Sequence, residues 1–511
     1  MGSEVTDDAA VEPVTSPGTP EVTELDLLLR RQRQSFFDDG PPSAAVRRDR
    51  IDRLLAMVLD NLDDYVEAMS ADFGTRSRTG TLFAEITGML TAIENTRSHT
   101  ARWMRPQRAS LLSRLYGIHT EVHPMPLGVV GIIGPWNFPL QLVVIPAASA
   151  FSAGNRVMIK MSEITAHTAE LTRSLAGIYF DPAELAVVTG GPDVGDAFAR
   201  LPLDHLFFTG STRVGRLVQR AAADNLVPVT LELGGKNPVV VGMDADLDTA
   251  AARIARARMV NGGQVCVCPD DVFVPADRCD RFAQTLLAQL RSMYPAIVSN
   301  DDYTSSVDAA NYDRVVGLID DARAHGARVE SAAPEGEALP DPVTRKIAPT
   351  VIRDVTEDMR IATEEVFGPV LTVRPYRSLP EVIAYVRQRP SPLVAYWFGP
   401  DGPDFRAFVD GTRSGGVARN EFAIHMISEK APFGGVGQSG MGAYHGKTGF
   451  DTFSHLRTVG STDLPFPITG NAAPPFSAVT KRLIAASLWA ARRRSRRRVG
   501  RRQLPGSSST S

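Results

Sequence analysis

Residues 205–233, HLFFTGSTRVGRLVQRAAADNLVPVTLEL, contain an apolar strand, a helical segment and a second apolar strand in direct succession. The same alternation includes RVMIKMS (156–162) and resumes after residue 268 with DDVFVP (270–275) and VLTVRPY (370–376). Strands that alternate with helices form a parallel sheet with helices on both faces. The sequence therefore predicts an α/β fold with two α/β domains.

Length and composition describe a folded, intracellular chain. Its 511 residues exceed what one hydrophobic core holds, so two or more domains are expected. The 43% hydrophobic and 22% charged residues are typical of a soluble globular protein. Three cysteines cannot make a disulfide framework, and no signal peptide opens the chain, so we expect a cytoplasmic protein.

The two ends of the chain differ from the body. Residues 1–24 contain acids but no Lys or Arg, with Pro, Ser, Thr and Gly, which predicts a disordered acidic head. Residues 461–511 have no acid after Asp463 and include RRRSRRRVGRR (492–502). This basic tail is either a solvated extension or a segment that binds nucleic acid or the periphery of an anionic membrane. LIAASLWAA (483–491) is too short to span a bilayer, but its apolar residues could lie on one helix face.

Residues 122–155 contain no Asp, Glu, Lys or Arg and are long enough to cross a bilayer. Five prolines interrupt the segment, which disfavours a spanning helix. We expect GVVGII (128–133) to be a buried strand that is followed by a loop and a helix. Residues 45–105 have the apolar spacing of helices.

Two strand ends carry residues that suit a dinucleotide. In FFTGSTRVGR, Gly210 and Gly215 lie between strand and helix, so backbone N–H groups at the helix N-terminus could face a phosphate. The stretch is neither GxGxxG nor a P-loop, and an ordinary strand-to-helix turn is the alternative. Lys160 and Glu163 follow another strand, where they could bond ribose hydroxyls or simply end an exposed strand.

Glu232 lies at the end of the second strand of the opening stretch, just before Gly234 and Gly235. A glycine pair lets a ligand approach the backbone closely, and a carboxylate beside it can act as a general base. The alternative is a carboxylate that points into solvent.

NGGQVCVC (261–268) is a metal clip, a packing element or the site of a nucleophile. Two cysteines without a neighbouring His supply too few ligands for structural zinc, so no metal site is expected. Cys268 and Cys279 are expected to be small buried hydrophobes. Cys266 follows a glycine-rich turn, where a thiol of ordinary pKa, roughly 8.5, can attack a ligand and its N–H can face an oxyanion.

Seven motifs occur in an order that resembles the aldehyde dehydrogenase superfamily. They are PWNFP (135–139), the Lys160/Glu163 pair, GSTRVG (210–215), LELGGK (231–236), NGGQVC (261–266), EEVFGP (364–369) and PFGGVGQSGMGAYHGKTGFDTFSH (432–455). The resemblance covers residues 25–460 and is strongest to the coniferyl aldehyde dehydrogenase group, which is related to the class 3 and fatty aldehyde dehydrogenases.

The resemblance implies an aldehyde dehydrogenase-like fold. It consists of a Rossmann-type cofactor domain, an α/β catalytic domain and a small oligomerisation arm. Residues 25–231 would form the cofactor domain, with part of the arm near 105–130, and residues 232–420 the catalytic domain. Residues 421–460 would return to the cofactor domain and the arm.

The resemblance also implies roles for particular residues. Cys266 would attack the aldehyde, Asn137 and the Cys266 N–H would hold the oxyanion, and Glu232 would activate the water that hydrolyses the thioester. The implied cofactor contacts are Trp136, Lys160, Glu163, Gly210, Ser211, Gly215, Leu233, Glu365 and Phe367. Among these, Glu163 favours the free 2′-hydroxyl of NAD, whereas Lys160 tolerates the 2′-phosphate of NADP.

Substrate and assembly follow from the same resemblance. The aldehyde would be aromatic, such as coniferyl aldehyde, or a medium- or long-chain aliphatic one, and the chain would form a homodimer. Met161, Val265 and Cys268 depart from the usual family residues, which leaves the substrate open. One alternative is a fatty aldehyde dehydrogenase that the basic tail holds at a membrane. Another is a non-catalytic relative, against which the intact Cys266 and Glu232 argue.

Overall fold

The chain was analysed as a computed structural model, which describes residues 23–109, 117–465 and 473–499. The predicted acidic head lies outside the described residues up to residue 22, and so does the end of the basic tail from residue 500. The chain divides into two compact units. The larger unit comprises residues up to Arg105 and Pro124–Leu456, and the smaller unit comprises Pro106–His123 and the residues from Arg457 onward.

The first sheet of the larger unit has six strands in the order β15-β7-β6-β3-β4-β5. They are β3 (Val129–Ile133), β4 (Arg156–Lys160), β5 (Leu185–Val188), β6 (His205–Gly210), β7 (Val229–Leu233) and β15 (Gly440–Met441). β3 to β7 run parallel, whereas β15 is antiparallel to β7. The strands predicted over residues 156–233 are therefore confirmed.

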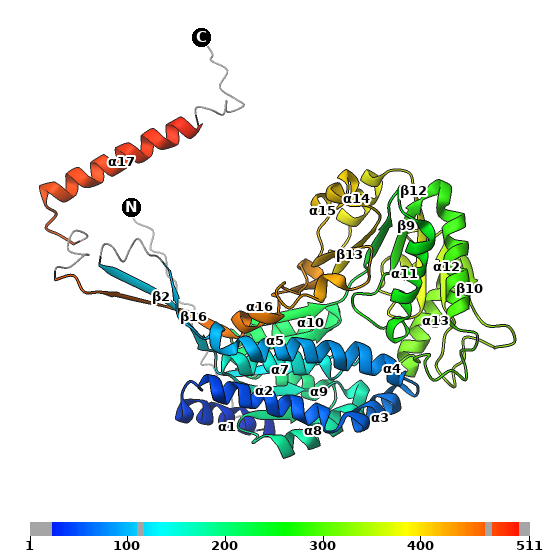
Figure 1. The fold of residues 1–511 in the computed structure, drawn as a ribbon, viewed down its shortest axis with the longest axis horizontal. Helices are drawn as coiled ribbons and strands as arrows, with labels where there is room; N and C mark the ends of the chain where they lie inside the picture. Colours follow the sequence, from blue (N-terminus) through cyan, green and yellow to red (C-terminus); the bar gives the residue numbers. More distant parts are fainter. Residues whose placement is uncertain (1–22, 110–116, 466–472, 500–511) are drawn as a thin grey trace, which may run out of the picture. The chain divides into compact units, whose positions relative to one another are not determined.

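Helices cover this sheet, and α2, α5 and α7 pack against one another (Figure 1). The helices of this part are α1 (Glu24–Asp39), α2 (Ala44–Leu59), α3 (Leu62–Phe73), α4 (Arg78–Thr81), α5 (Gly88–Trp103), α7 (Gln141–Ala153), α8 (Ala166–Tyr179), α9 (Pro192–Ala199), α10 (Thr212–Ala223) and α16 (Gly446–Thr452). The helical spacing predicted for residues 45–105 thus corresponds to four α-helices, with a π-helical segment at Leu82–Thr87 between the last two.

The uncharged segment 122–155 folds as predicted into a buried strand, β3, a loop and a helix, α7. All but the first two residues of α7 are buried, because neighbouring helices surround it. The apolar character of this segment therefore comes from its central position. Within the described ranges, no helix is long and apolar enough to cross a membrane.

The second sheet has seven strands in the order β10-β11-β12-β9-β8-β13-β14. They are β8 (Pro238–Val241), β9 (Asp271–Pro275), β10 (Arg328–Ser331), β11 (Thr350–Arg353), β12 (Val370–Tyr376), β13 (Val394–Phe398) and β14 (Gly416–Arg419). Its helices are α11 (Leu247–Met259), α12 (Cys279–Met293), α13 (Ala309–Ala324), α14 (Leu379–Arg387) and α15 (Pro403–Gly411). The sheet is parallel apart from β10, which pairs antiparallel with β11.

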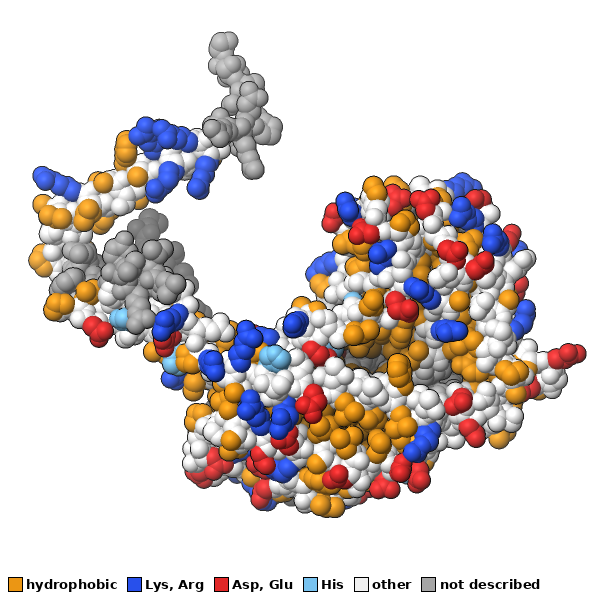
Figure 2. All heavy atoms as spheres, viewed as in Figure 1, with side chains coloured by type: hydrophobic (Ala, Val, Ile, Leu, Met, Phe, Trp, Pro, Cys, Tyr) orange, Lys and Arg blue, Asp and Glu red, His pale blue; other side chains and the backbone are white. Residues whose placement is uncertain are grey.

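The smaller unit contains a three-stranded sheet and a helix. The sheet has the order β1-β2-β16, with β1 (Gln107–Arg108), β2 (Ile118–Pro126) and β16 (Ser454–Thr462). The helix is α17 (Ala478–Val499). Lys and Arg side chains gather on its C-terminal half (Figure 2).

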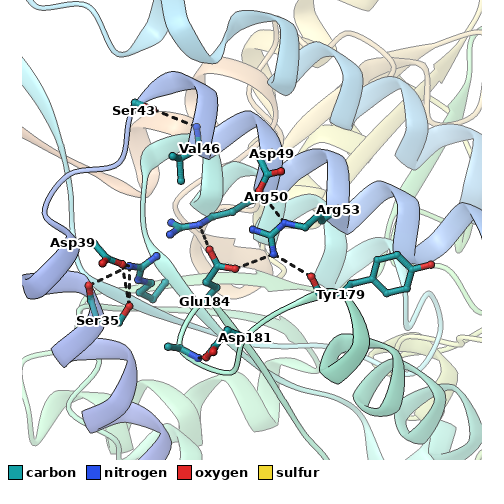
Figure 3. Close-up of polar contacts among 12 residues, drawn as sticks. Ser35, Asp39, Ser43, Val46, Asp49, Arg50, Arg53, Tyr179, Asp181 and Glu184 are labelled. Atoms are coloured by element: carbon teal, nitrogen blue, oxygen red, sulfur yellow. Dashed lines mark hydrogen bonds and ion pairs between the residues drawn. The ribbon is translucent and has the colours of Figure 1, made fainter.

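A group of ion pairs fixes α2 beside β5 (Figure 3). Arg50 Nε and Arg53 Nη1 contact the two carboxylate oxygens of Glu184, the residue before β5, over 2.9 and 2.8 Å. Arg53 Nη1 also donates to the backbone carbonyl of Tyr179, at the end of α8, over 3.0 Å. Arg53 therefore joins α2 both to the start of β5 and to the end of α8.

The two sheets of the larger unit are joined by a very short connection. β7 ends at Leu233 and β8 begins at Pro238, so only residues 234–237 lie between them. The largest hydrophobic core also includes residues of strands from both sheets, such as Val157 and Val272. The end of β7 is therefore held close to the second sheet.

Candidate active site

A cavity of about 640 Å³ lies at the carboxyl ends of the parallel strands of the first sheet. Lys160 lies at the end of β4, Gly210 at the end of β6 and Leu233 at the end of β7, and all three line the cavity. Ligands of open α/β sheets bind at this edge. Every catalytic or cofactor residue predicted from the sequence lines the cavity, with the exception of Gly215.

Gly215 has a packing role. A Cβ atom at this position would lie 2.7 Å from Cδ2 of Leu233, which is closer than real Cβ contacts come. The glycine thus lets α10 approach β7. Gly215 does not line the cavity, so the cofactor contact that the resemblance implies for it stays a prediction.

Lys160 and Glu163 lie together in the cavity wall. Lys160 is buried, and its Nζ contacts Oε2 of the half-exposed Glu163 over 3.0 Å. Nearby, the hydroxyl of Ser211 accepts a hydrogen bond from the N–H of Val214 and caps α10. The N-terminus of α10 therefore faces the cavity, and its partial positive charge suits a phosphate.

Glu232 is a buried carboxylate without a hydrogen-bond partner. Its side chain lies on β7, is 4% exposed, and neither carboxylate oxygen has a partner among the described residues. Burial raises the pKa of Glu232 well above its ordinary value. Because the side chain is buried, the alternative of a carboxylate that points into solvent is wrong. A carboxylate in this setting is a stronger base than one in water.

Gly234 makes room for a second carboxylate in the cavity. A Cβ at Gly234 would fall 2.2 Å from Oε2 of Glu365, so any larger residue would displace that side chain. Burial, and then the charge of Asp270, raise the pKa of Glu365 to about 8. Arg314 donates to the backbone carbonyl of Glu365 over 3.1 Å and so holds this segment in place.

The turn before the thiol has an unusual backbone. Asn261, Gly262 and Gly263 have φ angles of 49°, 63° and 80°, which lie in the left-handed region. A Cβ at Gly263 would lie 2.2 Å from the carbonyl oxygen of Gly368. Glycine is therefore required here by both conformation and space.

Cys266 is half-buried and lines the cavity, while Cys268 and Cys279 are buried, as predicted. Burial, and then the charges of Glu365 and Glu232, raise the pKa of the Cys266 thiol to about 12. The expectation of an ordinary thiol pKa is wrong for this reason. The sequence does not reveal that two acids lie beside the thiol.

Asn137 lies opposite this loop. Its side chain is 4% exposed, and its Nδ2 donates to the backbone carbonyl of Gln264 over 3.1 Å. Asn261 in turn donates to the backbone carbonyl of Asn137 over 3.1 Å. The neighbouring Trp136 packs edge-on against Phe367, with 5.3 Å between ring centroids. The PWNFP segment is thus joined to the thiol loop.

Some residues of the site have no signal in the sequence that singled them out. Arg213, Asn311 and Arg314 line the cavity, and Asn237 lies just behind the thiol loop. Arg213 follows the GST turn directly, so its place in the first turn of α10 is the one clue that could have been used.

Across residues 23–109, 117–465 and 473–499, no cluster of His, Cys, Asp or Glu is suited to a metal ion.

The thiol environment predicts its reactivity. Because only the thiolate reacts and the pKa of Cys266 is about 12, iodoacetamide should modify Cys266 slowly at neutral pH. The rate should rise about tenfold per pH unit between about pH 7 and 9, since the thiolate fraction does so below the pKa. Mass spectrometry of the modified peptides measures this rate, with the buried Cys268 and Cys279 as internal controls. A rate that levels off near pH 8.5 would contradict the raised pKa.

Comparisons with known proteins agree with this geometry. Residues 34–459 match the model of the aldehyde dehydrogenase family. The probable coniferyl aldehyde dehydrogenase of Caulobacter vibrioides is 44% identical over 84% of this chain and 90% of its own length. The dimeric NADP-preferring aldehyde dehydrogenase of Rattus norvegicus is 35% identical over 84% of this chain and 93% of its own. The substrate-bound structure of Staphylococcus aureus AldH superimposes with a TM-score of 0.84, at 33% identity, over 91% of this chain and 99% of that one. The chain therefore belongs to the aldehyde dehydrogenase family, as its seven motifs predicted.

Proposed function

We propose that this protein oxidises an aldehyde to the carboxylic acid with NAD or NADP. The observation that supports this most strongly is the shared cavity. The candidate thiol, Cys266, the candidate base, Glu232, and the amide of Asn137 line the same 640 Å³ cavity as the predicted dinucleotide contacts. A nucleophile, a base and an oxyanion donor around one space are the parts that acyl transfer through a thiol requires.

The cavity residues fit a nicotinamide dinucleotide. Glu163 and Lys160 would hold the adenosine ribose, and the capped N-terminus of α10, at Ser211, would take the pyrophosphate. Glu365, which the absence of a side chain at Gly234 admits to the cavity, would hold the nicotinamide ribose. A bound dinucleotide supplies the hydride acceptor. Glu163 suits the free 2′-hydroxyl of NAD, and Lys160 accommodates the 2′-phosphate of NADP.

The protein's own groups divide the reaction into two steps. In the first, the Cys266 thiol releases its proton to water and its sulfur adds to the aldehyde carbon, while the Asn137 amide and the Cys266 N–H hold the oxyanion of the thiohemiacetal. Loss of hydride from that carbon leaves a thioester on Cys266. In the second, Glu232 takes a proton from water, which attacks the thioester and releases the carboxylic acid and the thiol. The site is buried, so each of these charges is stabilised by fixed groups rather than by solvent.

The substrate class that we propose is an aromatic aldehyde of the coniferyl type. Support comes from the name and the 44% identity of the Caulobacter relative. We further propose that residues 25–231 form the cofactor domain, residues 232–420 form the catalytic domain and residues 421–460 return to the first. A homodimer is proposed by analogy with the relative that is named dimeric.

We also propose a second role, in which α17 binds an anionic membrane surface. Leu483 and Trp489 of this helix are each 62% exposed, and the helix ends in arginines (Figure 2). Trp489 lies 5.3 Å from the guanidinium of Arg493, measured from its ring centroid. Apolar side chains followed by basic ones suit the interface of anionic lipids better than nucleic acid, which offers no apolar layer.

The proposed activity predicts the result of a substrate panel. Purified protein should reduce NAD or NADP with coniferyl aldehyde at a higher kcat/KM than with a long-chain aliphatic aldehyde. Cys266→Ala should abolish dinucleotide reduction, whereas Cys268→Ala should retain most of it, because the Cys268 thiol points to the backbone carbonyl of Ala257. Activity in the Cys266 variant, with loss in the Cys268 variant, would reverse the assignment of the nucleophile.

Glu232→Gln should separate the two steps. Hydrolysis requires the base and hydride loss does not, so a first burst of reduced dinucleotide should persist while steady-state turnover falls by about 10²- to 10⁴-fold. Stopped-flow absorbance measures both phases in one experiment. Loss of the burst would instead show that Glu232 also takes the proton of the Cys266 thiol, whose pKa is about 12.

The membrane role predicts salt-dependent vesicle binding. The full chain should sediment with vesicles that contain phosphatidylserine but not with purely phosphatidylcholine vesicles, and added salt should release it. A chain that ends before Ala478 should not sediment with either. Binding of the full chain to duplex DNA, without binding to vesicles, would favour the nucleic-acid alternative.

A further inference from the structure

The loop that carries the thiol, residues 264–268, is held through its backbone carbonyls. The side chain of Asn137 donates to the carbonyl of the first residue, Gln264, over 3.1 Å. The N–H of the last residue, Cys268, donates to the carbonyl of the second, Val265, over 3.0 Å. The hydroxyl of Tyr396 donates to the carbonyl of the fourth residue, Val267, over 2.7 Å. The third and fifth carbonyls have a common partner, Asn237, so all five are fixed.

Asn237 uses every hydrogen-bonding atom of its side chain. Its Nδ2 donates to the carbonyl of Cys266 over 2.8 Å and to that of Cys268 over 2.9 Å. Its Oδ1 accepts from the N–H of Val394, the first residue of β13, over 3.0 Å. The side chain is 1% exposed and does not line the cavity. A buried amide with three such bonds has one available orientation.

Asn237 connects the thiol loop to the strand that carries Glu232. It is the last of the four residues that connect β7 to β8, five positions after Glu232. Rotation about the Cα–C bond of Cys266 is fixed once its carbonyl is held, and so is the backbone that carries the thiol. One side chain therefore sets the position of the thiol relative to the strand that carries the base.

We infer that Asn237 is a positioning residue for the thiol, acting through the backbone of the loop and not by contact with substrate. This inference rests on the proposed function. If Asn237 no longer donates, the loop can shift, and a displacement of about 1 Å at a nucleophile costs up to about a hundredfold in rate. Dinucleotide binding should not change, because its contacts lie elsewhere in the cavity.

Two variants test the loop, and a third controls for loss of stability. Asn237→Asp keeps the shape but places carboxylate oxygens against two carbonyls. Tyr396→Phe removes the hydroxyl that donates to a carbonyl of the same loop. Asn155→Asp is the matched control, because Asn155 is also buried and its Nδ2 also donates to two backbone carbonyls, those of Ala150 and Phe453, at 3.2 and 2.8 Å.

The measurements on each variant are kcat/KM for the aldehyde, NADH affinity by fluorescence, melting temperature, and the pH dependence of Cys266 alkylation by iodoacetamide. Asn237→Asp should lower kcat/KM by about ten- to a hundredfold, with NADH affinity within about twofold of wild type. Its alkylation profile should move to higher pH, because a carboxylate next to the loop disfavours the thiolate. Tyr396→Phe should change kcat/KM in the same direction by a smaller factor.

Asn155→Asp should lower the melting temperature by about as much as Asn237→Asp does, while its kcat/KM stays near that of the wild type. Equal losses of kcat/KM in Asn155→Asp and Asn237→Asp would overturn the inference, since they would reflect stability alone. If Asn237→Asp does not fold, an unchanged kcat/KM in Tyr396→Phe would overturn it as well. Failure of the wild-type protein to oxidise any aldehyde would instead refute the proposed function, while the alkylation profiles would still report on the loop.

Discussion

The chain passes from the first sheet to the second in four residues, and the site depends on this short connection. Fully extended, the five residue steps from Leu233 to Pro238 span at most about 18 Å, so the end of β7 and the start of β8 stay close together. Glu232 precedes the connection and Asn237 ends it. The proposed base and the residue proposed to support the thiol loop are therefore neighbours by covalent constraint, before any side chain packs. The continuous core that both sheets share makes the arrangement rigid.

Close backbone approaches complete the site. Gly234 admits the carboxylate of Glu365, and Gly263 admits the carbonyl of Gly368, each at a distance that a methyl group would prevent. These two contacts bring the segment that follows Arg360–Ala362 against both the base strand and the thiol turn. The result is a small space in which burial raises the pKa of two carboxyls and a thiol, and the charges of the two carboxyls raise that of the thiol further. Packing and electrostatics thus have the same origin, namely glycine at the points of contact.

Much of the fold and of the candidate site could be predicted from the sequence, and the exceptions have physical reasons. Strands such as β4, β6 and β7 were predictable because apolar runs and helical spacing are local properties. Lys160, Gly210 and Glu232 were predictable because parallel strands end at one edge of a sheet. The close packing of Gly215 against Leu233 was not predictable, because it depends on how α10 lies on β7. Asn237 and Tyr396 carry no local signal, because their bonds to the thiol loop join residues 29 and 129 positions apart. The pKa of Cys266 likewise depends on acids distant in sequence.

The raised pKa of Cys266 also bears on how this protein withstands oxidants. Hydrogen peroxide and disulfides react with thiolates, and a thiol with a pKa of about 12 presents almost none at neutral pH. Cysteines that sense peroxide have the opposite property, a low pKa and an open setting. A protein whose reaction passes through a sulfur atom must otherwise risk sulfenic acid whenever it waits for substrate. Here burial, with a smaller contribution from the two neighbouring carboxyl groups, keeps the sulfur protonated at rest, so the setting that makes the thiol slow to ionise also preserves it.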